Sequence, residues 1–304
     1  MALLLPEADG VAEFTVRRLP AAEVLGYESA DAARLDDVTF YCLPYMGDAA
    51  SLRLIGLMPR LAVVQSLSSG VDDVLAAVPP QAVLCNGHGL GHEEGTAELA
   101  VTLILASLRQ LPRFAAEQAS RAWSHVRTEA LAGQRVLLVG YGGIGTAIER
   151  RLAPFGVQVS RVSRTARPGV SGLAELPGLA AAADILVVCI ALHSATRGLI
   201  GREVLAALPD GALVVNVARG PVVDPGALTS ELRAGRLRAA LDVTDPEPLP
   251  PDRPEWTLPN VLLTPHIGGD TFAFARRAPE FVAEQAARHL DGRPLENVVR
   301  PALS

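Results

Sequence analysis

The stretch Val136-Leu-Leu-Val-Gly140-Tyr-Gly142-Gly-Ile-Gly145 decides the fold of this chain. Four apolar residues predict a strand, and a GxGxxG pattern that leads into a predicted helix follows it directly. Its three glycines allow a tight turn, close approach of the backbone to a pyrophosphate, and close packing of the helix on the strand. The pattern therefore predicts a dinucleotide-binding βαβ unit, with the anion at the start of the helix. The predicted contacts in this loop are Gly140, Gly142, Gly143 and Ile144.

Short runs rich in Val, Leu and Ile alternate with Ala- and Leu-rich helical stretches along the chain. Continuous apolar runs are typical of strands buried on both faces of a parallel sheet. Repeated strand–helix units therefore predict an α/β fold. The predicted strands are 38–42, 61–65, 83–85, 136–139, 157–162, 185–190, 212–217, 239–243 and 261–264, and the predicted helices include 93–113, 146–153 and 202–208.

Two predicted crossings divide the chain into domains. A helix is predicted from Glu93, directly after the glycine-rich loop 86–91, and its acidic start suits the positive end of a helix. This helix is the first predicted crossing between two domains, and residues 268–281 form the crossing back. We therefore expect a discontinuous smaller domain around a cofactor domain. The smaller domain comprises residues 1–96 and 273–304, and the cofactor domain comprises residues 97–272.

The composition agrees with two folded domains. The 304 residues are more than one hydrophobic core holds comfortably, and 49% hydrophobic with 20% charged residues is typical of a soluble protein. The net charge is −6 and no block of Lys or Arg stands out, so we expect neither a nucleic-acid nor a membrane partner. Three cysteines without a CxxC pair, no signal-peptide pattern and no apolar run long enough for a bilayer predict a cytoplasmic location.

The end of the predicted strand 157–162 indicates which dinucleotide binds. An acidic residue there would bind the ribose 2′-hydroxyl of NAD, but this chain has Ser163-Arg164-Thr165 and no carboxylate. An arginine beside hydroxyl side chains can instead bind a 2′-phosphate. The sequence therefore favours NADP(H), with NAD(H) as the second possibility. In the alternative interpretation, Arg161 and Arg164 are solvated surface charges.

Three reactive side chains, Arg219, Glu247 and His266, each follow a predicted strand. In open parallel sheets, ligands bind at the carboxyl ends of the strands, so we expect these side chains to meet at one edge. An arginine can hold a carboxylate with two hydrogen bonds and polarise a neighbouring carbonyl. A histidine can give or take a proton near neutral pH, and a carboxylate beside it holds the ring and favours its charged form. The set predicts an active site that uses acid–base chemistry.

Six motifs lie along nearly the whole chain: Ser68-Ser-Gly-Val-Asp72, Thr96-Ala-Glu98, the Gly140 loop, Asn216-Val-Ala-Arg219-Gly220, Asp242 to Pro248 and Thr264-Pro-His266-Ile-Gly-Gly269. Together they resemble the D-isomer-specific 2-hydroxyacid dehydrogenase family. The resemblance implies an α/β fold of two Rossmann-like domains with parallel sheets, in which the cofactor domain is inserted into a discontinuous, flavodoxin-like substrate domain. It also implies a cleft between the domains and a homodimer.

The resemblance further implies a reaction and a role for each residue. Hydride from the nicotinamide would reduce a small 2-keto acid, such as glyoxylate or hydroxypyruvate, to the D-2-hydroxy acid. Arg219 would bind the keto acid, His266 would protonate its carbonyl oxygen, and Glu247 would pair with His266. The backbone N–H groups of Ser69 and Gly70 would bind the substrate carboxylate. The remaining implied cofactor contacts are Val217 and Asp242, with Asp242 near the nicotinamide amide.

Three alternatives have weaker support. A phosphoglycerate dehydrogenase without a regulatory domain shares these motifs, but no basic residue lies around Ser68 and Ser69, which argues against a phosphorylated substrate. A dinucleotide-sensing corepressor of the same fold can keep all three reactive side chains, so these do not exclude it. His88 and His92 are four residues apart without a third ligand pattern, and we expect no metal.

Overall fold

The computed structural model describes residues 1–29 and 32–302 and divides the chain into two compact units. Unit 1 comprises Met1–His92 and Gly269–Ser304, and unit 2 comprises Glu93–Gly268. The chain crosses between the units at residues 92–93 and returns at 268–269, where the sequence predicted 96–97 and 272–273. Unit 2 is accordingly one continuous segment, and the parts of the chain on either side of it form unit 1.

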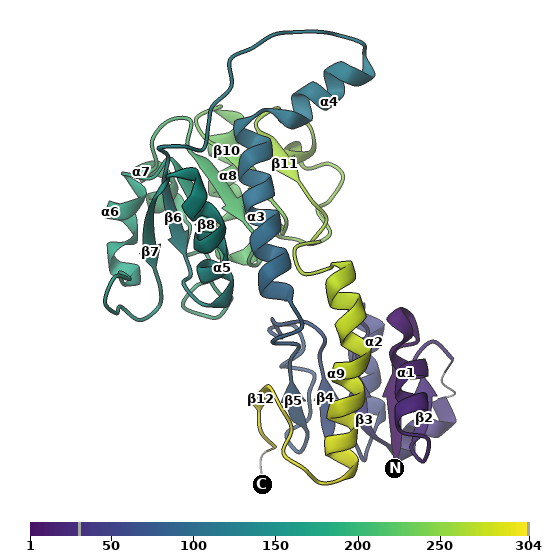
Figure 1. Cartoon of the computed structure of the whole chain (residues 1–304). Coiled ribbons are helices and arrows are strands. Elements are labelled where there is room, and N and C mark those ends of the chain that lie inside the picture. Colours follow the sequence, from purple (N-terminus) through teal and green to yellow (C-terminus); the bar gives the residue numbers. More distant parts are fainter. Residues whose placement is uncertain (30–31, 303–304) are drawn as a thin grey trace. The chain divides into compact units, whose positions relative to one another are not determined.

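Unit 2 contains a six-stranded sheet with the order β11-β10-β9-β8-β6-β7, in which every neighbouring pair is parallel (Figure 1). The chain runs from β6 outward to β7 and then crosses to β8 on the other side of β6. Ligands bind outside the carboxyl ends of parallel strands at such a reversal of strand order, which is where the glycine-rich loop after β6 lies. The strands are β6 (Arg135–Val139), β7 (Gln158–Val162), β8 (Ile185–Val188), β9 (Leu213–Asn216), β10 (Arg238–Leu241) and β11 (Val261–Leu263). The helices are α3 (His92–Leu108), α4 (Leu111–Ala119), α5 (Gly143–Leu152), α6 (Leu176–Ala180), α7 (Arg202–Ala207) and α8 (Pro225–Arg233), with 3₁₀ helices at Ala153–Phe155, Leu173–Glu175, Gly220–Val222 and Pro254–Trp256.

Both faces of this sheet are buried. Leu137 and Val139 of β6 belong to one hydrophobic cluster, whereas Val136 and Leu138 belong to another. Because successive side chains of a strand point to opposite faces, the two clusters cover the two faces of the sheet. This burial explains why the central strands β6, β8 and β9 are largely apolar runs, and the parallel sheet confirms the predicted α/β class.

Unit 1 contains a second six-stranded sheet, with the order β12-β5-β4-β3-β1-β2, in which β12 alone pairs antiparallel. The long helix α9 lies alongside α1, and its buried face, including Phe274, Ala278 and Val282, packs into the same core as Leu3 and Leu5 of β1 (Figure 1). The strands are β1 (Ala2–Leu5), β2 (Glu23–Gly26), β3 (Val38–Cys42), β4 (Val63–Gln65), β5 (Val83–Cys85) and β12 (Val298–Arg300). The helices are α1 (Val11–Arg18), α2 (Ala49–Leu54) and α9 (Phe272–Leu290), with 3₁₀ helices at Ala8–Gly10, Ala32–Asp37 and Ile55–Leu57.

The predicted helix 93–113 is interrupted at residues 109–110. The structure has α3 end at Leu108 and α4 begin at Leu111. Gln110 lies between them with φ +52°, a left-handed conformation that breaks a helix, and Pro112 stands in the first turn of α4, where proline is tolerated. Within residues 1–29 and 32–302, no single helix is long and apolar enough to cross a membrane, and α3 and α4 meet that criterion only as a pair bent by 65°.

Candidate active site

The glycine-rich loop between β6 and α5 is shaped by close backbone contacts. Gly140 has φ +108°, and a Cβ atom on it would lie 2.5 Å from the backbone nitrogen of Ile190. A Cβ on Gly145 would lie 2.2 Å from the carbonyl oxygen of Gly140. A larger residue at either position would therefore push the loop away from the neighbouring strand or helix.

Gly142 differs from these two glycines because a Cβ on it would meet no atom within 4 Å. It is the N-cap of α5 and has an extended backbone, with φ −105° and ψ −150°. The open space beside it and the N–H groups in the first turn of α5 fit the pyrophosphate of a dinucleotide. The cofactor contacts at Gly142, Gly143 and Ile144 stay predictions.

Two side chains from neighbouring elements border this loop. The thiol of Cys189 donates a hydrogen bond to the carbonyl oxygen of Gly140 over 3.0 Å, and burial raises the pKa of this thiol to about 12, so it stays protonated. From α3, Cγ of Glu93 lies 3.0 Å from the place where a Cβ of Gly143 would be. The neutral Cys189 thiol thus fixes one side of the loop, and the Glu93 side chain lies close to the start of α5.

Arg167 is a site residue that the sequence did not single out. Its Nη1 donates to Oγ of Ser163 over 3.1 Å, and its Nη2 donates to the carbonyl oxygen of Tyr141 over 2.5 Å. The guanidinium also lies over the Tyr141 ring, 5.6 Å from the ring centroid. It reaches back because the chain after β7 turns on itself, with a bridge between Arg167 and Val170. Arg167 therefore links the glycine-rich loop to the end of β7.

The predicted residues at the end of β7 are held in different ways. Ser163 is buried and its hydroxyl donates to the carbonyl oxygen of Thr165 over 2.7 Å, whereas Arg164 is exposed. Arg161 binds the Glu149 carboxylate, with Nε 2.7 Å from Oε2, and this bond is the main reason why the pKa of Glu149 lies below its usual value. Arg161 therefore makes a structural ion pair, which leaves Arg164 and Arg167 as the candidates for binding a 2′-phosphate.

Arg219 stands in a tight turn after β9. Asn216, the last residue of β9, accepts a hydrogen bond from the Ala218 N–H over 3.1 Å and donates its side-chain amide to the carbonyl oxygen of Arg219 over 3.1 Å. A Cβ on Gly220 would lie 1.8 Å from the carbonyl oxygen of Thr244, so glycine is needed for the loops after β9 and β10 to touch.

Val217 lies in the same turn, directly after β9. Its side chain is buried in the core, and its backbone N–H donates to the carbonyl oxygen of Val188 over 3.1 Å. The predicted cofactor contact of Val217 would therefore have to use its backbone carbonyl.

His266 and Glu247 form a pair. Nδ1 of His266 lies 2.5 Å from Oε1 of Glu247, and the Thr244 N–H donates to the other carboxylate oxygen over 3.4 Å. Burial alone would raise the pKa of Glu247, but the His266 hydrogen bond and the positive charges of His266 and Arg219 hold it below its usual value. The structure thus brings together the three side chains that the sequence assigned to the chemistry.

Asp242 holds the loop that carries His266. Its buried carboxylate accepts hydrogen bonds from the Thr264 hydroxyl over 2.6 Å and from the N–H groups of Ile267 and Gly268 over 2.9 Å each. The His266 N–H donates to the Asp242 carbonyl oxygen over 2.8 Å, and His266 itself has φ +55°. A non-glycine residue in this left-handed region is strained and needs such support. Asp242 is therefore a positioning residue for His266, and its contact with a nicotinamide amide stays a prediction.

Ser69 and Gly70 lie in unit 1, in the loop that follows β4. The Ser69 carbonyl oxygen accepts a hydrogen bond from the Asn86 side-chain amide over 2.8 Å. Among residues 1–29 and 32–302, the Ser69 hydroxyl oxygen is one of four buried side-chain nitrogen or oxygen atoms without a hydrogen-bond partner. A buried hydroxyl without a partner is costly, so a ligand that supplies an acceptor would stabilise this loop.

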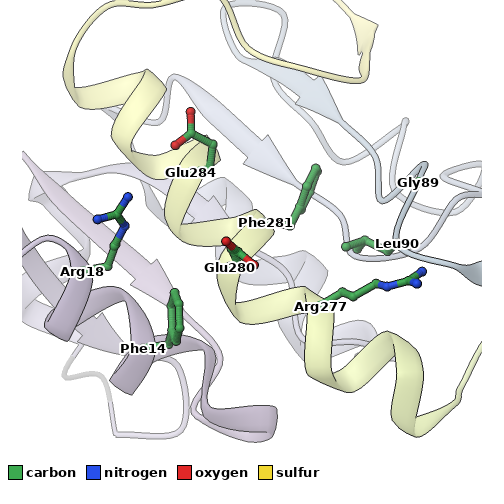
Figure 2. A pocket seen from close by; sticks show the side chains of 8 residues that line it. All are labelled: Phe14, Arg18, Gly89, Leu90, Arg277, Glu280, Phe281 and Glu284. Atoms are coloured by element: carbon green, nitrogen blue, oxygen red, sulfur yellow. The ribbon is translucent and has the colours of Figure 1, made fainter.

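A cavity of about 340 Å³ lies elsewhere on unit 1, between α1 and α9 (Figure 2). Phe14 and Arg18 of α1 line it from one side, and Arg277 and Phe281 of α9 line it from the other (Figure 2). None of the residues that the sequence assigned to the site lines this cavity, so we assign it no part in the chemistry.

Known proteins that resemble this chain carry related names. Residues 101–268 match the family model described as the NAD binding domain of D-isomer specific 2-hydroxyacid dehydrogenases. The human glyoxylate reductase/hydroxypyruvate reductase is 33% identical over 258 residues, which cover 79% of this chain and 77% of that protein. The D-3-phosphoglycerate dehydrogenase of Methanocaldococcus jannaschii is 34% identical over 253 residues, which cover 79% of this chain and 48% of that protein. The solved structure of a D-isomer specific 2-hydroxyacid dehydrogenase from Xanthobacter autotrophicus Py2, in complex with NADPH and MES, is 32% identical, has a TM-score of 0.79, and the match covers 98% of this chain and 97% of that one.

Proposed function

Because the chain belongs to the D-isomer specific 2-hydroxyacid dehydrogenase family and is an NAD(P)-dependent D-2-hydroxyacid dehydrogenase, we propose that it reduces a small, unphosphorylated 2-keto acid such as glyoxylate or hydroxypyruvate. The observation that carries the proposal is the 2.5 Å contact between His266 and Glu247, with Arg219 close enough to act on the same carboxylate. A histidine held by a carboxylate is a general acid, and an arginine beside it recognises a carboxylate substrate.

His266 supplies the proton in the proposed reaction. Because Nδ1 of His266 is bonded to Glu247, Nε2 is the nitrogen that gives a proton to the carbonyl oxygen of the substrate. A nicotinamide cofactor, when bound, would supply the hydride for the carbonyl carbon, and with the proton from His266 the carbonyl would become a hydroxyl. Glu247 keeps the ring oriented and stabilises its positive charge before the transfer.

Two groups of donors would bind the substrate carboxylate. The Arg219 guanidinium can form two parallel hydrogen bonds with it and polarise the adjacent carbonyl. The N–H groups of Ser69 and Gly70 and the unpaired Ser69 hydroxyl would supply further donors. The residues of this loop, Ser68 to Gly70, are uncharged, which favours a substrate without a phosphate group.

The residues at the end of β7 favour NADP(H) over NAD(H). Ser163 and Thr165 offer hydroxyl groups, Arg164 is exposed beside them, and Arg167 is held 3.1 Å from the Ser163 hydroxyl. Two arginines with hydroxyl groups suit a 2′-phosphate and leave the 2′-hydroxyl of NAD without an acidic partner. A kcat/KM at least tenfold higher with NADPH than with NADH would agree with this preference, and equal values would contradict it.

We also propose that the protein is a homodimer. The segment that follows α4 carries Trp123 with 99% of its surface exposed, and Leu111 at the start of α4 is 53% exposed. Exposed apolar side chains that gather into one patch mark a surface that a partner covers, and the proposal is that these two residues belong to such a surface. Sedimentation equilibrium of the wild type and of Trp123→Ser would show a dimer that the substitution weakens, and a wild-type monomer would contradict the proposal.

A panel of 2-keto acids tests the proposed function. The purified protein is given NADPH with glyoxylate, hydroxypyruvate or phosphohydroxypyruvate, and the loss of NADPH absorbance is followed. We expect turnover with the first two compounds and D-glycerate as the product from hydroxypyruvate. Turnover with phosphohydroxypyruvate alone would instead support a phosphoglycerate dehydrogenase, which the similarity to the Methanocaldococcus jannaschii enzyme keeps as the second candidate. No turnover with any compound would contradict both.

A further inference from the structure

His92 lies at the point where the chain leaves unit 1, as the first residue of α3. Only 4% of its surface is exposed. Its Nε2 lies 2.7 Å from the carbonyl oxygen of Leu67, and its Nδ1 lies 3.2 Å from the carbonyl oxygen of Gly269. Both ring nitrogens of this buried histidine therefore face backbone carbonyl oxygens.

This arrangement depends on the protonation of the ring. A carbonyl oxygen can only accept a hydrogen bond, and a neutral imidazole has a single N–H, so it can satisfy one of the two carbonyls. The other nitrogen would then direct its lone pair at the lone pairs of a carbonyl oxygen. Only the imidazolium ion, with an N–H on each nitrogen, donates to Leu67 and Gly269 together.

Two aromatic rings and the Gly269 backbone pack closely around the His92 ring. The ring of Tyr45 stacks on it with centroids 5.7 Å apart and 10° between the planes, and the ring of Phe274 lies 4.7 Å away. A Cβ on Gly269 would lie 2.6 Å from Nδ1. Tyr45 is the titratable side chain that stacks on the His92 ring. The nearest carboxylates in the sequence are those of Glu93, which follows His92, and Asp270, which follows Gly269.

The two carbonyls belong to segments with separate tasks. Leu67 directly precedes Ser68 to Gly70, the loop that would bind the substrate carboxylate. Gly269 is the first residue of unit 1 after the chain returns from unit 2, three residues beyond His266. His92 thus connects the outgoing crossing, the returning crossing and the carboxylate-binding loop through its two ring nitrogens.

We propose that His92 is a positioning residue that holds the Ser68–Gly70 loop in its binding shape while its ring is protonated. When the ring loses a proton, one of the two contacts is lost and the loop binds the keto acid less well. The inference rests on the proposed function, because it takes this loop to be the substrate-binding one. Cofactor binding, which depends on the Gly140 loop of unit 2, is independent of His92.

Kinetics of His92→Gln test the proposal, with His88→Gln as the matched control, because His88 is an exposed histidine four residues earlier. The KM for hydroxypyruvate, kcat and the Kd for NADPH are measured from pH 5.5 to 8.5. At pH 6 we expect His92→Gln to raise KM about fivefold, the effect of losing one hydrogen bond, while kcat and the NADPH Kd keep their wild-type values. At pH 8 the two KM values should converge, because a neutral ring keeps only one of the two contacts, and His88→Gln should match the wild type throughout.

A KM ratio that is the same at every pH would contradict the proposal, since it would show a role in packing alone. A changed NADPH affinity would contradict it as well. A second measurement covers the case in which His92→Gln does not fold or no keto acid is turned over. Hydrogen exchange of the Ser68–Gly70 amides in the wild-type protein, corrected for the intrinsic effect of pH, should be slower at pH 6 than at pH 8. Equal protection at both pH values would overturn the role of His92, whereas inactivity with the keto acids concerns the proposed function alone.

Discussion

The two units contain sheets of the same kind but use their strand ends differently. In unit 2, charged side chains follow the strands, and buried polar groups fix them: Asn216 holds the Arg219 turn and Asp242 holds the His266 loop. In unit 1, the loop after β4 offers small residues and backbone N–H groups, and His92 holds its base. In the proposed function, one architecture would supply charges for chemistry in unit 2 and neutral donors for substrate binding in unit 1, so the loops rather than the sheets would carry the function.

The largest expected effect comes from removing the charges of unit 2. His266→Ala should lower kcat by about 10²–10⁴-fold, the usual contribution of a general acid. Arg219→Ala should lower kcat/KM by about 10²–10³-fold, because it removes a donor preorganised for the reacting carbonyl. Both variants should bind NADPH like the wild type in a fluorescence titration. His125→Ala, which changes an exposed histidine of the same unit, is the control. Near-normal turnover in both variants would show that the chemistry lies elsewhere.

Glycine substitutions separate the tasks of the two units. Gly145→Ala would place a Cβ 2.2 Å from the Gly140 carbonyl oxygen, and Gly87→Ala would place one 2.0 Å from the Leu67 carbonyl oxygen. We expect each to lower the free energy of unfolding by about 1–3 kcal/mol through overpacking. Gly145→Ala should also lose NADPH binding, whereas Gly87→Ala should bind NADPH normally and raise the KM for the keto acid.

Gly178→Ala, in an open position on α6, should stabilise the protein by about 0.5–1 kcal/mol. Thermal unfolding and NADPH titration measure these effects, and normal NADPH binding by Gly145→Ala would break the comparison.

The sequence predicted unit 2 better than unit 1, for a physical reason. Strands buried on both faces need continuous apolar runs, and the Gly140 loop needs glycine for steric reasons, so both leave direct signals in the sequence. The strands β2 and β12 of unit 1 are short strands at the sheet edges and partly exposed, so they lack that signal. The strand β1 is fully buried, but its four residues are too few to stand out at the start of the chain.

Some residues of the candidate site could also be predicted from the sequence, and others could not. Arg219, Glu247 and His266 could be predicted because each directly follows a strand, and parallel strands bring such positions to one edge. Arg167 could not, because its side chain reaches Ser163 and Tyr141 only through the turn after β7. The one signal for it in the sequence is a second arginine three residues after Arg164. The two carbonyl contacts of His92 join positions 67 and 269, and a spacing of that length is visible only in the fold.

Glu247→Gln tests how far His266 depends on its partner. The substitution keeps the shape of the side chain but removes the charge that favours the protonated histidine. We expect kcat/KM for reduction to fall about 10–100-fold, the range for losing a hydrogen bond to a charged group. A near-normal kcat/KM would show that Glu247 does not act through His266.

The same substitution has a predictable effect on stability. His266 and Arg219 hold the pKa of Glu247 below its usual value, so the carboxylate stabilises the folded state above the usual pKa of about 4.5. This contribution is lost as the pH falls through the lowered pKa. The difference in unfolding free energy between wild type and Glu247→Gln should therefore be largest near neutral pH and shrink in acid. A difference that grows as the pH falls would contradict the assigned direction of the pKa shift.

Arg167→Ala has the smallest expected effect and concerns only the cofactor. It removes the guanidinium that lies 3.1 Å from the Ser163 hydroxyl, so the KM for NADPH should rise about tenfold, as for one charge-assisted hydrogen bond, while the KM for NADH stays unchanged. Arg161→Ala is the informative control, because Arg161 is bound to Glu149 and its loss should affect stability rather than the preference for NADPH. If Arg161→Ala changed the cofactor preference and Arg167→Ala did not, Arg161 would be the residue that binds the 2′-phosphate. Arg161 would then bind the cofactor, and Arg167 would have the structural role. The comparison between units 1 and 2 would still hold, because both arginines belong to unit 2.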